Sequence, residues 1–82
     1  MIDVHLNRET EAYDGGEQVL FVVRVGPENH VCSTIRKFYV GLDEDETYRE
    51  ASAFAEGASA AISAVSGLAA RFIQTGRIQG NT

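Results

Sequence analysis

A short Asp-Gly-Gly turn between two strand-like segments is the sequence feature that most restricts how this chain can fold. Before the turn, Ile2, Val4 and Leu6 alternate with polar side chains, which is the two-residue period of a half-buried strand. After it, residues 17–25 form a nearly continuous apolar segment rich in β-branched side chains, typical of a strand with neighbours on both sides. An Asp-Gly pair between two such segments predicts an antiparallel hairpin.

The turn also predicts how the two strands are paired. If Asp14 and Gly15 form a two-residue turn, the apolar side chains of both strands meet on one face, whereas a one-residue slip would separate them. The expected opposing pairs are Val4 with Val25, Leu6 with Val23, and Thr10 with Val19.

The following residues predict a third strand and then a helix. A Gly-Pro-Glu-Asn turn at 26–29 precedes a β-branched and aromatic segment over residues 30–40. The acidic run after it starts a helix, with Asp43 or Asp45 as the N-cap, or Thr47 with Glu50 as a capping box, and Gly76 as the stop. Gly67 is a position at which this helix can bend or break. A helical apolar stripe supports this assignment; it comprises Tyr48, Ala51, Ala55, Ala58, Ile62, Val65, Ala69 and Phe72. The predicted fold class is α+β, a three-stranded antiparallel meander followed by one long helix packed on one face of the sheet.

Length and composition set the class of protein. A chain of 82 residues allows one domain, which we place at residues 1–76, with 77–82 as a C-terminal tail that has room for a short extra strand. The single cysteine, Cys32, excludes an internal disulfide and is typical of a reducing compartment. The first residues lack the features of a secretory signal, and residues 51–73 are too polar to span a bilayer. We therefore expect a cytoplasmic protein with no membrane partner.

Acidic side chains are concentrated in two clusters, and the net charge is −5. Because this charge repels phosphate backbones, we expect no direct nucleic-acid binding. The clusters predict contact with a basic surface of a partner protein, although the second cluster is also typical of a solvated helix start. The first comprises Glu9, Glu11, Asp14 and Glu17, and the second comprises Asp43, Glu44, Asp45 and Glu46, with Glu50 one turn further on.

The motifs of common catalytic and metal sites are absent from the sequence. The acidic run does not fit a calcium loop, because Tyr48 and Phe54 stand where glycine and glutamate are needed. His30 and Cys32 share a face of a strand, where same-face neighbours lie ~6.5 Å apart, too far for a bonded thiolate–imidazole pair. No phosphate-binding loop, nucleophile elbow or dinucleotide fingerprint is present. The sequence predicts no catalytic residue, metal or cofactor.

The outward face of the helix lacks charge. From Gly57 to Ala70 the sequence contains no charged residue, although exposed helix faces ordinarily carry lysine and glutamate. Small side chains let two helices approach closely, so this face predicts a homodimer; a merely Ala/Ser-rich solvent face is the alternative. The residues of the predicted oligomer face are Gly57, Ala60, Ala64 and Gly67.

The sheet face away from the helix is a second candidate surface. Apolar Leu20, Val22 and Phe38 would be exposed there within a polar rim. This surface supports an alternative function, a small-ligand-binding or minor enzymatic domain; a second alternative is a structural homo-oligomer without further activity. The polar residues of this alternative site are His5, Glu9, Arg24 and Arg36.

The element order resembles that of several groups of small proteins. Sheet-first DNA-binding domains of the integrase and plant-transcription-factor kind share it but are basic across the sheet. Partial ribonuclease-H-like antitoxins share it together with an acidic hairpin turn, here Tyr13 to Gly16, and small acidic phage-encoded inhibitors are similar in size and charge. No motif specific to these groups is present, so no functional residue is transferred. The sequence predicts a non-enzymatic protein-binding module that engages the basic, nucleic-acid-binding surface of a partner, as phage-type inhibitors or antitoxin-like regulators do.

Overall fold

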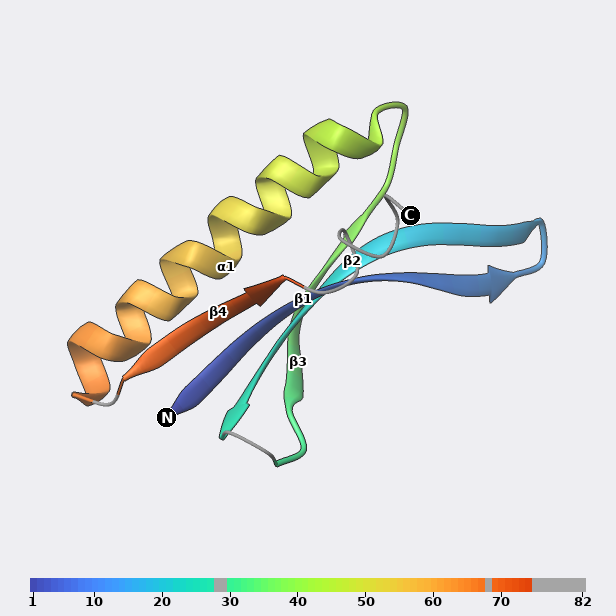
Figure 1. Cartoon of the computed structure of the whole chain (residues 1–82). Helices are drawn as coiled ribbons and strands as arrows, with labels where there is room; N and C mark the ends of the chain where they lie inside the picture. The colour runs from blue at the N-terminus through green and yellow to red at the C-terminus, as the bar shows by residue number, and fades with distance from the viewer. Residues whose placement is uncertain (28–29, 68, 75–82) are drawn as a thin grey trace.

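The computed structural model describes residues 1–27, 30–67 and 69–74, in which one helix packs on one face of a four-stranded mixed sheet (Figure 1). The sheet order is β3-β2-β1-β4, with β4 parallel to β1 and the other neighbours antiparallel. Along the chain the elements are β1 (Ile2–Tyr13), β2 (Gly16–Pro27), β3 (Ser33–Tyr39), α1 (Glu44–Ser66) and β4 (Ala70–Gln74). The three-stranded antiparallel meander and the single packed helix are confirmed, whereas β4 was not predicted.

The hairpin of β1 and β2 has the predicted register. Tyr13 pairs with Gly16, so Asp14 and Gly15 form the two-residue turn. The positive φ of the turn region falls on Gly16, at 132°, a conformation that glycine adopts without a steric penalty. The pairs Val4 with Val25, Leu6 with Val23, and Thr10 with Val19 are all confirmed.

A bulge in β3 changes which of its side chains lie on which face. Val23 pairs with Arg36, but the next residue of β2, Arg24, pairs with Thr34, so Ile35 is an extra residue in β3. An extra residue reverses the alternation of side chains beyond it. Arg36 therefore shares the helix-facing side of the sheet with Val23 instead of joining Arg24 on the other side.

The helix begins where the sequence predicted and ends earlier. The Asp43 side chain caps α1 by accepting hydrogen bonds from the backbone nitrogens of Asp45, at 3.0 Å, and Glu46, at 3.2 Å. At the other end Gly67 adopts the left-handed conformation, with φ 72°, that commonly terminates a helix. The predicted stop at Gly76 is wrong. The three- and four-residue spacing of apolar residues continues through Phe72, but residues 70–74 form a strand.

Residues expected to extend the helix instead form β4 along the free edge of β1. The backbone nitrogen of Ile2 donates to the carbonyl oxygen of Ala69 at 2.9 Å, and Phe72 pairs with Val4. This placement satisfies backbone groups of β1 that a three-stranded sheet would leave unpaired. The predicted tail at 77–82, with its possible strand, lies outside the described residues.

The core lies between α1 and the helix-facing side of the sheet. Its fully buried members are Val4, Leu6, Phe21, Val23, Ala51 and Ala55. The two alanines bring the helix backbone close to the sheet, and aromatic pairs flank them: Tyr48 contacts Phe21 with ring centroids 5.5 Å apart, and Phe54 contacts Phe38 at 5.6 Å. Val65, which the stripe placed in the core, is instead 88% exposed near the end of the helix. No helix in the described part of the chain is long and apolar enough to cross a membrane.

We predict opposite effects on stability for alanine at two glycines. A Cβ at Gly26 would lie 2.8 Å from the sulfur and 2.9 Å from the Cα of Cys32, so Gly26→Ala is expected to destabilise the fold by ~1–3 kcal/mol. A Cβ at Gly57 would meet nothing within 4 Å, so Gly57→Ala should stabilise by up to ~1 kcal/mol through helix propensity. Urea denaturation of both variants checks this; a stable Gly26→Ala protein would contradict the close approach.

Candidate functional site

Most of the basic side chains that the structure describes form ion pairs with acids of the same chain, and there are four such pairs. Three of them, together with a tyrosine hydroxyl, hold carboxylates on the sheet face opposite α1, hereafter the reverse face. The fourth joins β1 to the start of α1, where the Arg8 guanidinium contacts both carboxylate oxygens of Glu44 at 3.2 Å. The full set is Arg8 with Glu44, Arg24 with Glu9, Lys37 with Glu11, and Arg71 with Asp3.

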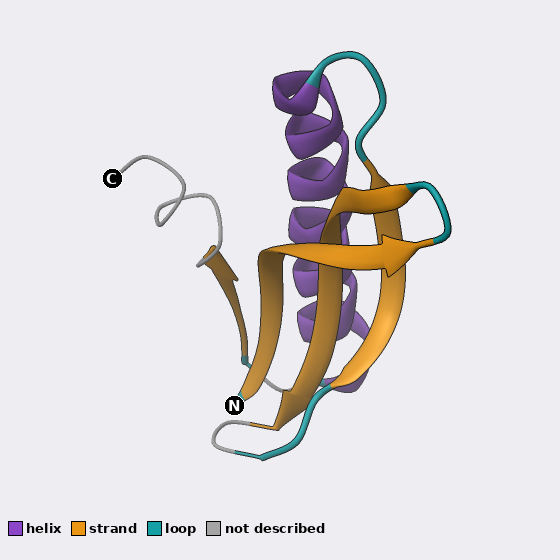
Figure 2. Cartoon of the chain, turned by 90° about the vertical axis from the view of Figure 1, so that its right-hand side faces the viewer, coloured by secondary structure: helices purple, strands orange, loops and turns teal. Residues whose placement is uncertain are grey.

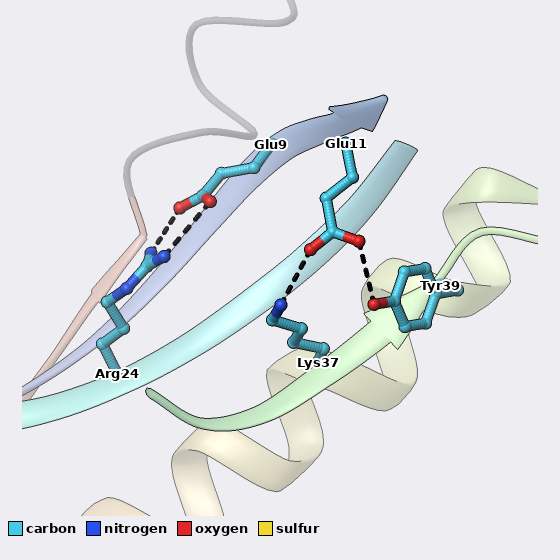
Figure 3. Close-up of polar contacts among 5 residues, drawn as sticks. All are labelled: Glu9, Glu11, Arg24, Lys37 and Tyr39. Atoms are coloured by element: carbon cyan, nitrogen blue, oxygen red, sulfur yellow. Dashed lines mark hydrogen bonds and ion pairs between the residues drawn. The ribbon is translucent and has the colours of Figure 1, made fainter. Parts of the chain in front are cut away.

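Glu11 connects two strands that are not neighbours. Its carboxylate accepts a hydrogen bond from Lys37 Nζ at 2.7 Å and another from the Tyr39 hydroxyl at 3.0 Å (Figure 3). Because β2 lies between β1 and β3, both bonds pass over β2. These two hydrogen bonds lower the pKa of the Glu11 carboxyl below its ordinary value. The bond from Lys37 has the largest effect and the bond from Tyr39 the next largest.

Glu9 and Arg24 form a second bridge beside the first. The Arg24 guanidinium donates two hydrogen bonds to the Glu9 carboxylate, one of them at 3.2 Å (Figure 3). In the register Arg24 is opposite His5 while Glu9 is opposite Leu20, so the bridge spans the row that contains Val22. The hydrogen bonds to Glu9 are also the main reason that the pKa of Arg24 is raised.

The predicted apolar patch on the reverse face is therefore wrong. Leu20 and Val22 do point to this side, but both side chains are fully buried. The aliphatic stems of long side chains that bridge over β2 cover apolar surface in this way. Phe38 lies on the other side of the sheet, against the core.

The alternative sheet-face site is only partly assembled. His5, Glu9 and Arg24 share the reverse face, but Glu9 and Arg24 are bonded to each other. The prediction for Arg36 is wrong: the bulge turns it to the helix side, where its guanidinium lies 4.8 Å from the Phe38 ring centroid and 5.3 Å from that of Phe54. These distances are typical of cation–π contacts.

A buried carboxylate connects the first and last strands on the reverse face. The Asp3 side chain is 6% exposed and accepts two hydrogen bonds from Arg71, at 3.2 and 3.3 Å. His5 Nε2 lies 3.9 Å from an oxygen of the same carboxylate. The paired geometry compensates the burial of the Asp3 charge and holds β4 against β1.

The acidic clusters predicted as contact sites contain carboxylates with different roles in the structure. Glu9, Glu11 and Glu44 are in ion pairs, and Asp43 caps the helix. Other exposed carboxylates of these clusters lie at the hairpin tip and in the first turns of α1, which occupy the same end of the molecule, opposite the N-terminus (Figure 2). We call this region the acidic end; it comprises Asp14, Glu17, Asp45, Glu46 and Glu50, all exposed.

An open hollow of about 350 Å³ lies at the acidic end, where β3 turns into α1. Carboxylates of the first helical turns line one part of it, and Leu42 in the connecting loop is fully exposed beside them. Sequence reasoning missed Leu42, although an apolar residue next to an acidic run in a short loop was a usable signal. The lining residues are Tyr39, Gly41, Leu42, Asp43, Glu46, Thr47 and Glu50.

The predicted oligomer face is exposed in the single chain. Gly57, Ala60 and Ala64 lie on the solvent side of α1. Gly67 has a separate role in the fold, because its left-handed conformation ends the helix. Contact of this face with a second copy stays a prediction.

Within the described part of the chain, no three histidine, cysteine or acidic side chains gather as they would around a metal ion. Cys32 is half-buried, with its sulfur 3.7 Å from the carbonyl oxygen of His30. Comparison of the chain with protein-family models, with curated proteins and with solved structures finds no match.

We predict that Lys37→Gln raises the pKa of the Glu11 carboxyl toward its ordinary value, because the largest cause of its lowering is removed. A carboxyl whose pKa is lower in the folded state stabilises the fold above its unfolded-state pKa. That contribution is lost as pH falls through the folded-state value, and Lys37→Gln should reduce it. A carboxyl-detected NMR titration measures the change, with Arg49→Gln on α1 as the control. Equal Glu11 midpoints in wild type and Lys37→Gln would contradict the bridge over β2.

Proposed function

We propose that this chain is a non-enzymatic protein-binding module whose acidic end engages a basic surface of a partner protein. The observation that carries the proposal is the separation of charge within the fold. Arg8, Arg24, Lys37 and Arg71 are paired with acids of the same chain, so the excess negative charge belongs to the other carboxylates, among them those of the acidic end. A localised acidic surface attracts a basic partner from solution and orients it on approach.

The hollow adds a place where an apolar side chain of the partner can be buried. Binding energy in protein interfaces comes mainly from a few side chains buried at the centre, with charges at the rim. The exposed Leu42 lines the hollow together with Tyr39, Glu46 and Glu50, which combines both kinds of group. An arginine- or lysine-rich segment with one apolar side chain fits this arrangement.

Nucleic-acid-binding proteins are the partner class that this surface suits best. Their phosphate-binding surfaces are basic and are complementary to outward carboxylates in the same way as to phosphates. Occupation of such a surface would exclude nucleic acid, so we propose that the module acts as an inhibitor or antitoxin-like regulator in the cytoplasm.

The decisive experiment measures affinity for a partner first isolated by cross-linking to this chain and then purified. The double variant Glu46→Gln/Glu50→Gln should weaken binding by about tenfold, since each exposed charge contributes ~0.2–1 kcal/mol. The loss should shrink at high salt, because salt screens exposed charges. Glu56→Gln, also on the exposed surface of α1 but outside the acidic end, is the matched control and should leave affinity unchanged.

The apolar part of the site is tested separately. Leu42→Ser should weaken the same partner, whereas Val31→Ser, an equally exposed apolar residue at the opposite end of the molecule, should not. Equal effects of the two serine variants on affinity would contradict the acidic end as the binding surface. An affinity that is unchanged in the carboxylate variants would contradict it as well.

A further inference from the structure

The two edges of the sheet are protected to different degrees. An open edge strand presents unpaired backbone groups and invites another strand, and proteins ordinarily block it with bulges and charged side chains. The β3 edge has both, a bulge at Ile35 and the basic residues Arg36 and Lys37. β4, the other edge strand among the described residues, pairs with β1 without a bulge and has one charged side chain, Arg71, which is paired with Asp3 as Lys37 is paired with Glu11.

The direction of the free backbone groups on β4 follows from its pairing with β1. The carbonyl of Ala69 accepts from Ile2, which fixes the alternation along the parallel ladder. The backbone groups of Arg71 and Ile73 then point toward β1, and those of Ala70, Phe72 and Gln74 point toward the open edge. These outward groups form a regular row of donors and acceptors that fits another strand.

The charge distribution identifies the strand that fits there. From Gly57 onward the sequence contains no acidic residue, and α1 packs over β4 with its uncharged second half beside that edge (Figure 1). A basic partner is attracted to the acidic end of the molecule and has no electrostatic reason to bind here. Two copies of a chain with net charge −5, by contrast, repel each other least when they approach through a face without acids.

We propose that β4 pairs antiparallel with β4 of a second copy, giving a two-fold symmetric dimer with a continuous eight-stranded sheet. The symmetry axis passes beside Phe72, so Phe72 of each copy is opposite its equivalent in a hydrogen-bonded pair, with Cα atoms ~5.5 Å apart. The two phenylalanines lie on the helix side of the joined sheet, where aromatic cross-strand pairs are favourable. On the reverse face, Arg71 of each copy is opposite the second copy's Ile73.

This cross-strand neighbour gives a matched pair of test variants. Ile73→Lys places two like charges opposite each other at both symmetric positions, whereas Ile73→Glu places opposite charges there. Both variants lose the same half-buried isoleucine, so their thermal unfolding should be similar and their association should not. We expect the dimer Kd of Ile73→Lys to exceed that of Ile73→Glu by at least about tenfold.

Sedimentation equilibrium of the full chain measures association directly. The wild type should approach twice the 8.9 kDa mass of the chain as concentration rises. Amide hydrogen exchange at Ala70 and Phe72 should slow only as the dimer forms. A wild type that stays monomeric at millimolar concentration, equal Kd values for the two Ile73 variants, or amides already protected in the monomer would each overturn this interface.

Discussion

β1 holds the molecule together through contacts with every other element. On its reverse face, Asp3 is paired with Arg71 of β4, Glu9 with Arg24 of β2, and Glu11 with Lys37 of β3. On its other face, Val4 and Leu6 form the core under α1, and Arg8 pairs with Glu44 at the start of that helix. A single strand with strict two-residue alternation thus supplies an apolar side and an ionic side, and the arrangement of all other elements depends on it.

The ion pairs on this side of β1 also determine the distribution of charge on the surface. Each base that pairs with a carboxylate of β1 or α1 has its charge balanced within the chain, so the other exposed acids determine the sign of the surface charge. Three carboxylates of β1 itself are each bonded to a base on another strand, so they contribute to the stability of the sheet. The acidic end arises because the remaining carboxylates belong to a hairpin tip and to helical turns that have few bases nearby, Arg49 being one. The proposed partner surface is therefore a by-product of how the sheet is stabilised.

Local patterns predicted the parts of this fold that local rules govern. The Asp14-Gly15 turn fixed the register of the hairpin, and Asp43 capped the helix as its side chain and position indicated. Gly67 indicated a position where the helix can break, and the helix ends there. The identity of β4 was not predictable in the same way, because Phe72 satisfies the spacing of both a helix and a strand. Only a tertiary interaction, the pairing of this segment with the otherwise unpaired edge of β1, distinguishes the two.

The candidate site was predictable to a similar extent. The acidic residues were found from composition, but their division into paired and outward groups depends on cross-strand neighbours such as Lys37 and Tyr39, which have no local signal. Arg36 was assigned to the wrong face because one extra residue, Ile35, reverses the alternation of β3. The hollow next to Leu42 depends on how the loop turns between two elements, which side-chain periodicity does not describe.

The parallel pairing of the first and last strands has a consequence for biosynthesis. Asp3 and Arg71 are 68 residues apart, so the ribosome must release nearly the whole described chain before the sheet can close. Until then the nascent hairpin presents the bare flank of its N-terminal strand, and contacts of such long sequence separation form slowly. Premature termination within the helix would leave that flank permanently open, so the abundance of intact protein in a cell depends on complete translation as well as on thermodynamic stability.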